Sequence, residues 1–169
     1  VQRGIDLIEQ AVASGAPPAA TPYRMVGLAK TQQQDYDGAI AAFAEAVALQ
    51  PSDVTSRSEM AALMMIKGQL DEAAEHFQKV LSMAPDHADS LVGLSRIAAK
   101  KSDAAGARKL LKKAVAAAPE HTKVRQLMAR DLLSAGDRDG AREQFLQILR
   151  VSPKDTEALL QLGFLSHSD

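Results

Sequence analysis

A repeat with a period of about 34 residues runs through the sequence and constrains its fold more than any other feature. Prolines recur at this interval without a single insertion, at Pro17, Pro51, Pro85, Pro119 and Pro153. Three more columns keep the interval: Ala39, Ala73, Ala107 and Ala141; Phe43, Phe77, Leu111 and Phe145; and Ala46, Val80, Ala114 and Ile148. Self-similarity at a period of this length is typical of stacked units that each pack on their neighbours. The sequence therefore favours an array over a single globular core.

Each period has the apolar spacing of two amphipathic helices. In the first complete unit, apolar residues three and four apart predict a second helix from about Asp37 to Gln50. Pro51 ends this helix, because proline cannot continue it and pushes the preceding residue out of the α region. The first helix shows the same spacing at Tyr23, Val26, Gly27 and Lys30, and in a later unit at Leu91, Leu94, Ser95 and Ala98.

A short turn is expected between the two helices of each unit. It holds a glycine in two units and a polar residue in the other two: Gly68 and Gly136, Gln34 and Ser102. Acidic residues follow in or near the next first turn, where they complement the helix dipole: Asp37, Asp71 and Asp139. Small residues are expected to face each other where the helices cross, with Gly27, Ala61 and Ala129 opposite Ala39, Ala73 and Ala141.

Composition agrees with closely packed helices and argues against several classes of function. The chain is 46% hydrophobic but only 4% aromatic, which favours helices over a β-sandwich or barrel. A net charge of −1 gives no general attraction to nucleic acid or to anionic membranes. Because the 169 residues include no cysteine, they hold no disulfide, no thiolate nucleophile and no cysteine-based zinc site.

No pattern in the sequence points to catalysis. The motifs GxSxG and HExxH, a Gly-rich phosphate loop and an EF-hand loop are all missing. His87 and His121 occupy equivalent positions after the closing prolines, and we expect them to be exposed turn residues too far apart to share a metal ion. The carboxylates are scattered over solvated helix faces. We therefore expect no enzyme activity, no cofactor and no metal site.

These motifs resemble the tetratricopeptide repeat family over the whole chain. The family residues are Tyr23, Gly27, Tyr36, Ala39, Phe43, Ala46 and Pro51 in one unit, Ala61, Gly68, Leu70, Ala73, Phe77 and Pro85 in the next, and Ala129, Gly136, Ala141, Phe145 and Pro153 in the last complete one. In the third complete unit Leu111 replaces the aromatic residue and Ser102 the turn glycine, so we expect it to be the loosest. The resemblance implies an all-α fold, a right-handed α-solenoid of antiparallel helix-turn-helix repeats.

The repeat register predicts one array over residues 1–169. Complete repeats are expected at 20–53, 54–87, 88–121 and 122–155, between a second helix alone in 1–19 and a first helix alone in 156–169. Within these halves the lone helices are expected at about Gly4–Ala16 and Thr156–Ser166. Such ends expose apolar surface unless something covers it. We interpret the chain as a fragment of a longer array; a second hypothesis is end-to-end self-association through the half-repeats.

The resemblance also implies a concave groove, lined by the first helices, that binds a peptide or a helical segment. The groove candidates are the first-helix residues outside the packed stripe, chiefly Arg24, Leu28, Met65, Ile66, Val92, Arg96, Lys100, Leu127, Arg130 and Phe164. The first half is apolar, and the second half is basic and suited to acidic groups. The sequence has no Asn, and Leu28, Ala62, Gly93 and Leu127 stand where a clamp for chaperone C-termini would place its donors. A chaperone-binding role is therefore disfavoured.

Two further clusters have an ordinary structural explanation. Lys100, Lys101, Arg108, Lys109, Lys112 and Lys113 form a basic group that is either an anionic docking face or, as we favour, a solvated outer face. Met60 and Met64 are expected in the core, which leaves Met65 for the groove.

The leading functional hypothesis is a scaffold for protein–protein interaction, with no nucleic-acid partner and no direct membrane insertion. Two alternatives stay open: a regulatory or substrate-binding module of a larger enzyme such as a glycosyltransferase, or a segment of a bacterial secretion or exopolysaccharide-export assembly. No signal peptide and no membrane span are recognisable. We expect a soluble protein of the bacterial cytoplasm or periplasm.

Overall fold

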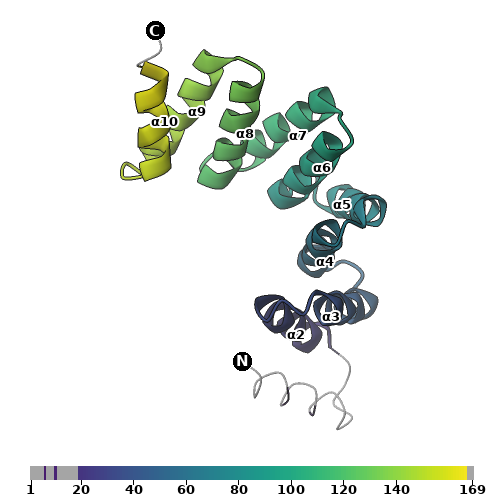
Figure 1. Ribbon diagram of the computed structural model, residues 1–169. Coiled ribbons are helices and arrows are strands. Elements are labelled where there is room, and N and C mark those ends of the chain that lie inside the picture. Colours follow the sequence, from purple (N-terminus) through teal and green to yellow (C-terminus); the bar gives the residue numbers. More distant parts are fainter. Residues whose placement is uncertain (1–5, 7–9, 11–18, 167–169) are drawn as a thin grey trace. The chain divides into compact units, whose positions relative to one another are not determined.

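The computed structural model describes Asp6, Gln10 and residues 19–166, and these residues form helices and no strand (Figure 1). The all-α repeat fold predicted from the sequence is confirmed. The predicted lone helix at Gly4–Ala16 lies outside the described residues, apart from Asp6 and Gln10. The helices are α2 (Ala20–Gln32), α3 (Tyr36–Leu49), α4 (Val54–Ile66), α5 (Leu70–Met83), α6 (Ala88–Lys100), α7 (Ala104–Ala117), α8 (Thr122–Ser134), α9 (Arg138–Val151) and α10 (Thr156–Ser166).

The chain divides into two compact units, Val1–Pro85 and Asp86–Asp169. In the first unit α3 packs on both α2 and α4, and α4 packs on α5. In the second unit each helix from α6 to α10 packs on the next one along the chain. The structure therefore builds each unit from neighbours in sequence, as a repeat protein does.

Helix ends follow the proline column. The residue before each of four prolines has left the α region, with φ between −131° and −136°: Gln50, Ala84, Ala118 and Ser152. The predicted stop at Gln50 is confirmed, since α3 ends at Leu49. Steric conflict between the proline ring and the preceding residue explains all four ends.

The turns inside the helix pairs share one backbone geometry. Gln34, Gly68, Ser102 and Gly136 all have a positive φ, between 62° and 84°. The next N–H donates to a carbonyl five positions earlier, as from Asp35 to Lys30 at 3.0 Å and from Asp137 to Leu132 at 2.9 Å. This arrangement is the Schellman motif, which satisfies the last carbonyls of the first helix. The predicted turn positions are therefore correct, and they also require a left-handed residue.

Second helices begin at an N-cap that the sequence analysis missed. Asp35, Asp103 and Asp137 each accept a hydrogen bond from the backbone N–H three positions later, at 2.8–3.0 Å. In all three cases the donor is a glycine, and a Cβ atom on it would collide with the capping carboxylate. The Asp-x-x-Gly spacing was the available signal, since an aspartate before a helix caps its orphan N–H groups.

The predicted core columns are buried. Ala39, Ala73 and Ala141 are fully inaccessible, and Phe43, Phe77 and Phe145 are almost so. At Gly27 the helices cross closely, because a Cβ atom there would lie 2.7 Å from the ring of Phe43. Met60 is buried and Met64 packs against the same cluster, as predicted, whereas Met65 is half-buried.

The surroundings of His87 differ from those expected from the sequence. It is a half-buried residue that caps α6, whereas we expected an exposed turn residue. Its Nδ1 accepts a hydrogen bond from the Ser90 N–H at 3.3 Å and lies 3.1 Å from the Ser90 hydroxyl. The equivalent His121 is exposed and makes no side-chain cap. The two histidines share the same position after the closing proline, so the repeat position alone could not distinguish them.

Candidate binding surface on the first helices

The first helices of both units present the candidate groove residues. Within the helix pairs, α2, α4, α6 and α8 each pack on the second helix that follows. One register position in each repeat lies outside this helix–helix contact. It holds Leu28, Ala62, Arg96, Arg130 and Phe164. All are exposed except Ala62, which is half-buried. The repeat thus brings the same register position to the surface of one first helix after another.

In the first unit this surface is mostly apolar. Leu28 on α2 is 43% exposed and Ile66 on α4 is 60% exposed, while Met65 is half-buried. Met25, which was not among the predicted candidates, is 53% exposed. Exposed apolar side chains grouped on one part of a protein mark interaction sites more often than isolated ones do.

Arg24, a candidate for the groove, has a structural contact. Its guanidinium lies 3.7 Å from the Asp53 carboxylate, which is buried at the start of α4. Asp53 also accepts hydrogen bonds from the Thr55 and Ser56 N–H groups at 3.1 Å and from the Ser56 hydroxyl at 2.7 Å. Arg24 therefore helps to hold α2 against the start of α4.

In the second unit the candidates have mixed environments. Val92 and Leu127 are half-buried and pack against the core cluster around Met128. Arg96 and Lys100 are exposed on α6. The two apolar residues thus form the edge of the core, and the two cations extend from it into solvent.

In the second unit, the arginine at one repeat position has a carboxylate partner, whereas the arginine at the same position one repeat earlier has none. Arg130 on α8 donates a hydrogen bond to the Glu157 carboxylate on α10 at 2.5 Å. One repeat earlier, Arg96 takes the place of Arg130 and Lys123 takes the place of Glu157. In the part of the chain that the structure describes, neither Arg96, Lys100 nor Lys123 has a carboxylate within ion-pair distance. The unpaired positive charge therefore lies on α6 and at the start of α8.

The basic group around α7 is divided. Arg108 donates a hydrogen bond at 2.5 Å to Asp131 on α8, and this contact raises the pKa of Arg108 above its usual range. Lys109, Lys112 and Lys113 are exposed. Arg108 therefore joins two helices, and the three lysines face solvent.

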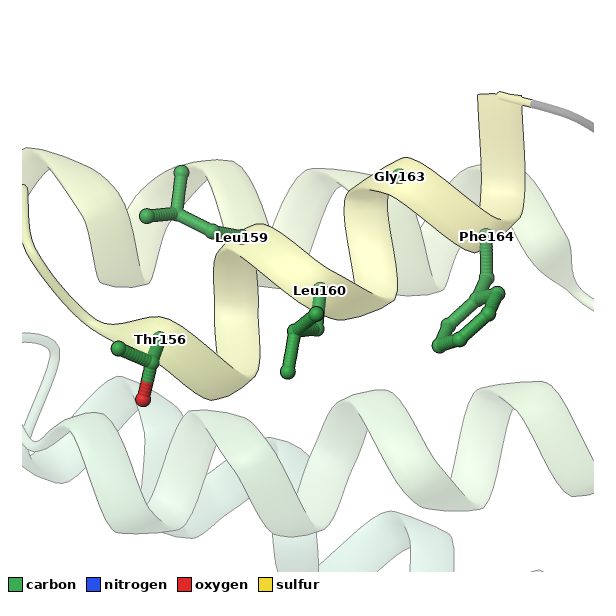
Figure 2. Close-up of a pocket in the computed structure, with 5 residues that line it drawn as sticks. All are labelled: Thr156, Leu159, Leu160, Gly163 and Phe164. Carbon is green, nitrogen blue, oxygen red and sulfur yellow. The ribbon is translucent and has the colours of Figure 1, made fainter.

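Figure 2 shows a shallow hollow of about 690 Å³ along α10, lined by Thr156, Leu159, Leu160, Gly163 and Phe164. Thr156, Leu160 and Phe164 extend from one side of the helix and Leu159 from the other (Figure 2). Leu160 and Phe164 are 63% and 68% exposed. Of these residues only Phe164 was predicted as a groove candidate; Leu160 was not, although it has the repeat position of Arg24 and Val92, which were.

The described residues were also compared with the requirements of a titrating group, a metal site and a membrane span. Burial, aided by Arg57, lowers the pKa of His76, and Glu75 and Glu72 partly oppose this shift. Among the residues described, no three His, Asp or Glu side chains are grouped so that they could hold a metal ion. Nor does any described helix combine the length and the hydrophobicity needed to cross a bilayer.

Comparison with known proteins gives matches to family models and to solved structures. Two models described as tetratricopeptide repeat match the sequence, one at residues 64–130 and 98–163 and the other at residues 1–54. These matches cover more than half of the chain. A comparison with curated proteins gave no match.

Solved structures with a similar fold include three tetratricopeptide repeat proteins. PilF of Pseudomonas aeruginosa has a TM-score of 0.77 and 19% identity over 88% of this chain and 68% of its own. A thermophilic TPR protein of Thermus thermophilus has a TM-score of 0.75 and 20% identity over 95% of this chain and 88% of its own. YrrB, described as a TPR protein with an unusual peptide-binding site, has a TM-score of 0.68 and 21% identity over 95% of this chain and 82% of its own.

Proposed function

Because the chain belongs to the tetratricopeptide repeat family, we propose that it is a non-catalytic scaffold whose first helices bind a peptide or a helical segment of another protein. The observation that carries this proposal is the exposure of large apolar side chains on the first helices, at positions that packing within the units does not use. Leu28 and Ile66 are the clearest cases. The fold it shares with YrrB, which is described as having a peptide-binding site, supports the proposal.

The first unit offers an apolar binding surface of its own. Met25, Leu28, Met65 and Ile66 present flexible and branched side chains on α2 and α4. Methionine adapts its shape to irregular partners, so this surface suits apolar side chains spaced along a peptide or along one face of a helix. Arg24 would contribute less, since it is already paired with Asp53.

The second unit offers a charged binding surface of its own. Arg96 and Lys100 on α6 and Lys123 on α8 have no acidic partner among the described residues. A carboxylate on the ligand would form charge-assisted hydrogen bonds with these groups and relieve the repulsion between them. We therefore expect the second unit by itself to prefer acidic ligands.

Peptides selected from a random phage-display library against the chain provide a test. We expect the selected peptides to be rich in acidic and apolar residues. Replacing Leu28 by serine should weaken their binding at least about tenfold in fluorescence anisotropy, because it removes an apolar contact made only with the ligand. Ile66→Ser should act in the same direction.

Leu146→Ser is the matched control for this experiment. Leu146 on the second helix α9 is 43% exposed, the same fraction as Leu28, so both changes remove the same side chain from an equally exposed position. We expect the control to bind like the wild type. Equal losses of affinity in both variants, or no loss in either first-helix variant, would refute the proposed surface.

A further inference from the structure

Lys123, at the start of α8, reverses the charge found at the same position of the next repeat. That position holds Glu157, which accepts a hydrogen bond from Arg130 of the preceding first helix at 2.5 Å. Arg96 stands one repeat before this arginine. The spacing from Arg96 to Lys123 is 27 residues, the same as from the arginine to the glutamate of the ion pair. Two cations therefore occupy the repeat positions that hold an ion pair one repeat later.

A second set of contacts indicates that the two successive repeats pack in the same register. Arg108 on α7 donates a hydrogen bond to the Asp131 carboxylate on α8 at 2.5 Å. Its counterpart Arg142 on α9 donates to the Leu165 carbonyl on α10 at 3.3 Å. In both contacts the acceptor residue lies 23 positions after the arginine. Because equivalent arginines reach equivalent residues, the two cations are placed to meet as the arginine and glutamate of the next repeat do.

The chain supplies no acid for these cations among the residues that the structure describes. Arg96 and Lys123 have no ion pair there, and Lys100, one turn beyond Arg96 on α6, has none either. The single acid of α6, Asp89, lies seven residues before Arg96, about 10 Å along the helix axis. Like charges held close together repel each other, and an anion between them removes this repulsion.

The number of charges favours a phosphate monoester over a carboxylate as this anion. One carboxylate balances one arginine in the next repeat, so a single carboxylate between Arg96 and Lys123 would leave one positive charge unbalanced. A phosphorylated serine or threonine carries about −1.5 to −2 charges at pH 7 and has three acceptor oxygens. Arginine binds phosphate through two parallel hydrogen bonds, and lysine binds it as a point charge. One phosphate group would thus satisfy both cations.

We propose that Arg96 and Lys123 bind the phosphate of a phosphoserine or phosphothreonine in the ligand segment, and that Lys123 determines this specificity. The inference rests on the proposed function, because it assigns a ligand group to the charged surface of the second unit. Lys100 adds a third positive charge and suits an acidic residue near the phosphorylated one. In the next repeat Glu157 takes the place of the phosphate, so its arginine is already neutralised.

Three peptides that differ only in their central residue test the proposal by fluorescence anisotropy. Their common sequence is selected against the chain from a library with a fixed central phosphoserine, and the central residue is then phosphoserine, glutamate or serine. We expect the phosphoserine peptide to bind at least about tenfold tighter than the glutamate peptide, and the serine peptide to bind weakest. Equal affinity for phosphoserine and glutamate would overturn the phosphate site and leave the proposed acidic-ligand surface intact.

Lys123→Glu tests the specificity residue itself. The glutamate should pair with Arg96, as in the ion pair of the next repeat, so affinity for the phosphoserine peptide should fall at least about tenfold while the melting temperature does not fall. Lys112→Glu is the matched control, because it makes the same charge change at an exposed position on α7 of the same unit. Salt screens this more distant charge, and affinity should fall by less than about threefold. Equal losses in both variants would overturn the site, since net charge alone would then govern binding.

Moving the charge reversal by one repeat gives a second readout. In the double variant Lys123→Glu with Glu157→Lys, Arg130 loses its carboxylate and meets a lysine, so the two-cation site is rebuilt one repeat later. We expect this chain to recover binding of the phosphoserine peptide that Lys123→Glu alone loses. A double variant with full helix content by circular dichroism that binds no better than Lys123→Glu would contradict the proposal.

Discussion

Ser102 and Gln34 are the two non-glycine residues with a left-handed backbone among those the structure describes, with φ of 65° and 62°. Their counterparts Gly68 and Gly136 hold the same conformation without a Cβ atom. The Schellman geometry of the turn requires this backbone whichever residue stands there. Ser102 and Gln34 therefore carry a strain that the two glycines avoid.

Replacing Ser102 by glycine should stabilise the second unit. We expect the free energy of unfolding to rise by about 1 kcal/mol, because glycine reaches the left-handed region without steric cost. Urea denaturation followed by circular dichroism measures this change. Gly136→Ser is the reverse substitution at the equivalent turn and should lower stability by a similar amount. A loss of stability in Ser102→Gly would show that the serine makes a compensating contact.

Single residues also mark the limit of what the sequence predicted. The alanine and phenylalanine columns were assigned correctly, because burial follows directly from the repeat period. The pairs Arg24–Asp53 and Arg130–Glu157 were missed, since each joins two first helices that have a whole second helix between them in the sequence. Which residues meet across that distance depends on how neighbouring repeats pack, and a period alone does not specify this.

At the scale of helices, each element depends on its neighbours for stability. Second helices bury an aromatic or leucine residue against the first helix of their own pair, and their outer faces stay in solvent. Phe77 on α5 is 2% exposed, whereas Lys112 on α7 is exposed. The cost of a substitution should therefore depend on the face of the helix that carries it.

Phe77→Ala should lower the free energy of unfolding by about 3–5 kcal/mol, because it removes a large buried side chain and leaves a cavity. Lys112→Ala should change it by no more than about 0.5 kcal/mol, as is usual for exposed sites. Urea melts of both variants give the comparison. Similar effects in the two variants would contradict the assignment of the helix faces.

Helix α10 was predicted correctly from the sequence, at Thr156–Ser166. The sequence also predicted exposed apolar surface on this helix, and Leu159, Leu160 and Phe164 are exposed. Leu160 was not predicted as a groove candidate, although it has the repeat position of Arg24 and Val92, which were.

At the scale of the whole molecule, the chain is an array whose described helices pack on their neighbours in sequence within each compact unit. Local packing of this kind explains why the fold was readable from one sequence, since most contacts join residues that are close along the chain. Only part of the candidate surface could be predicted from the sequence. Its apolar residues Leu28 and Ile66 follow from the repeat register, whereas the unpaired charge near Arg96 depends on which cations find carboxylates on adjacent helices.

The first helices are expected to bind the ligand, and backbone NMR chemical shifts of the labelled chain, recorded with and without a selected peptide, test this claim. For an apolar peptide we expect the largest shift changes on α2 and α4, around Leu28 and Ile66, and for an acidic peptide on α6, around Arg96. Little change is expected around Lys112 on α7 in either case. Changes concentrated on the second helices, with the first helices unaffected, would contradict the claim.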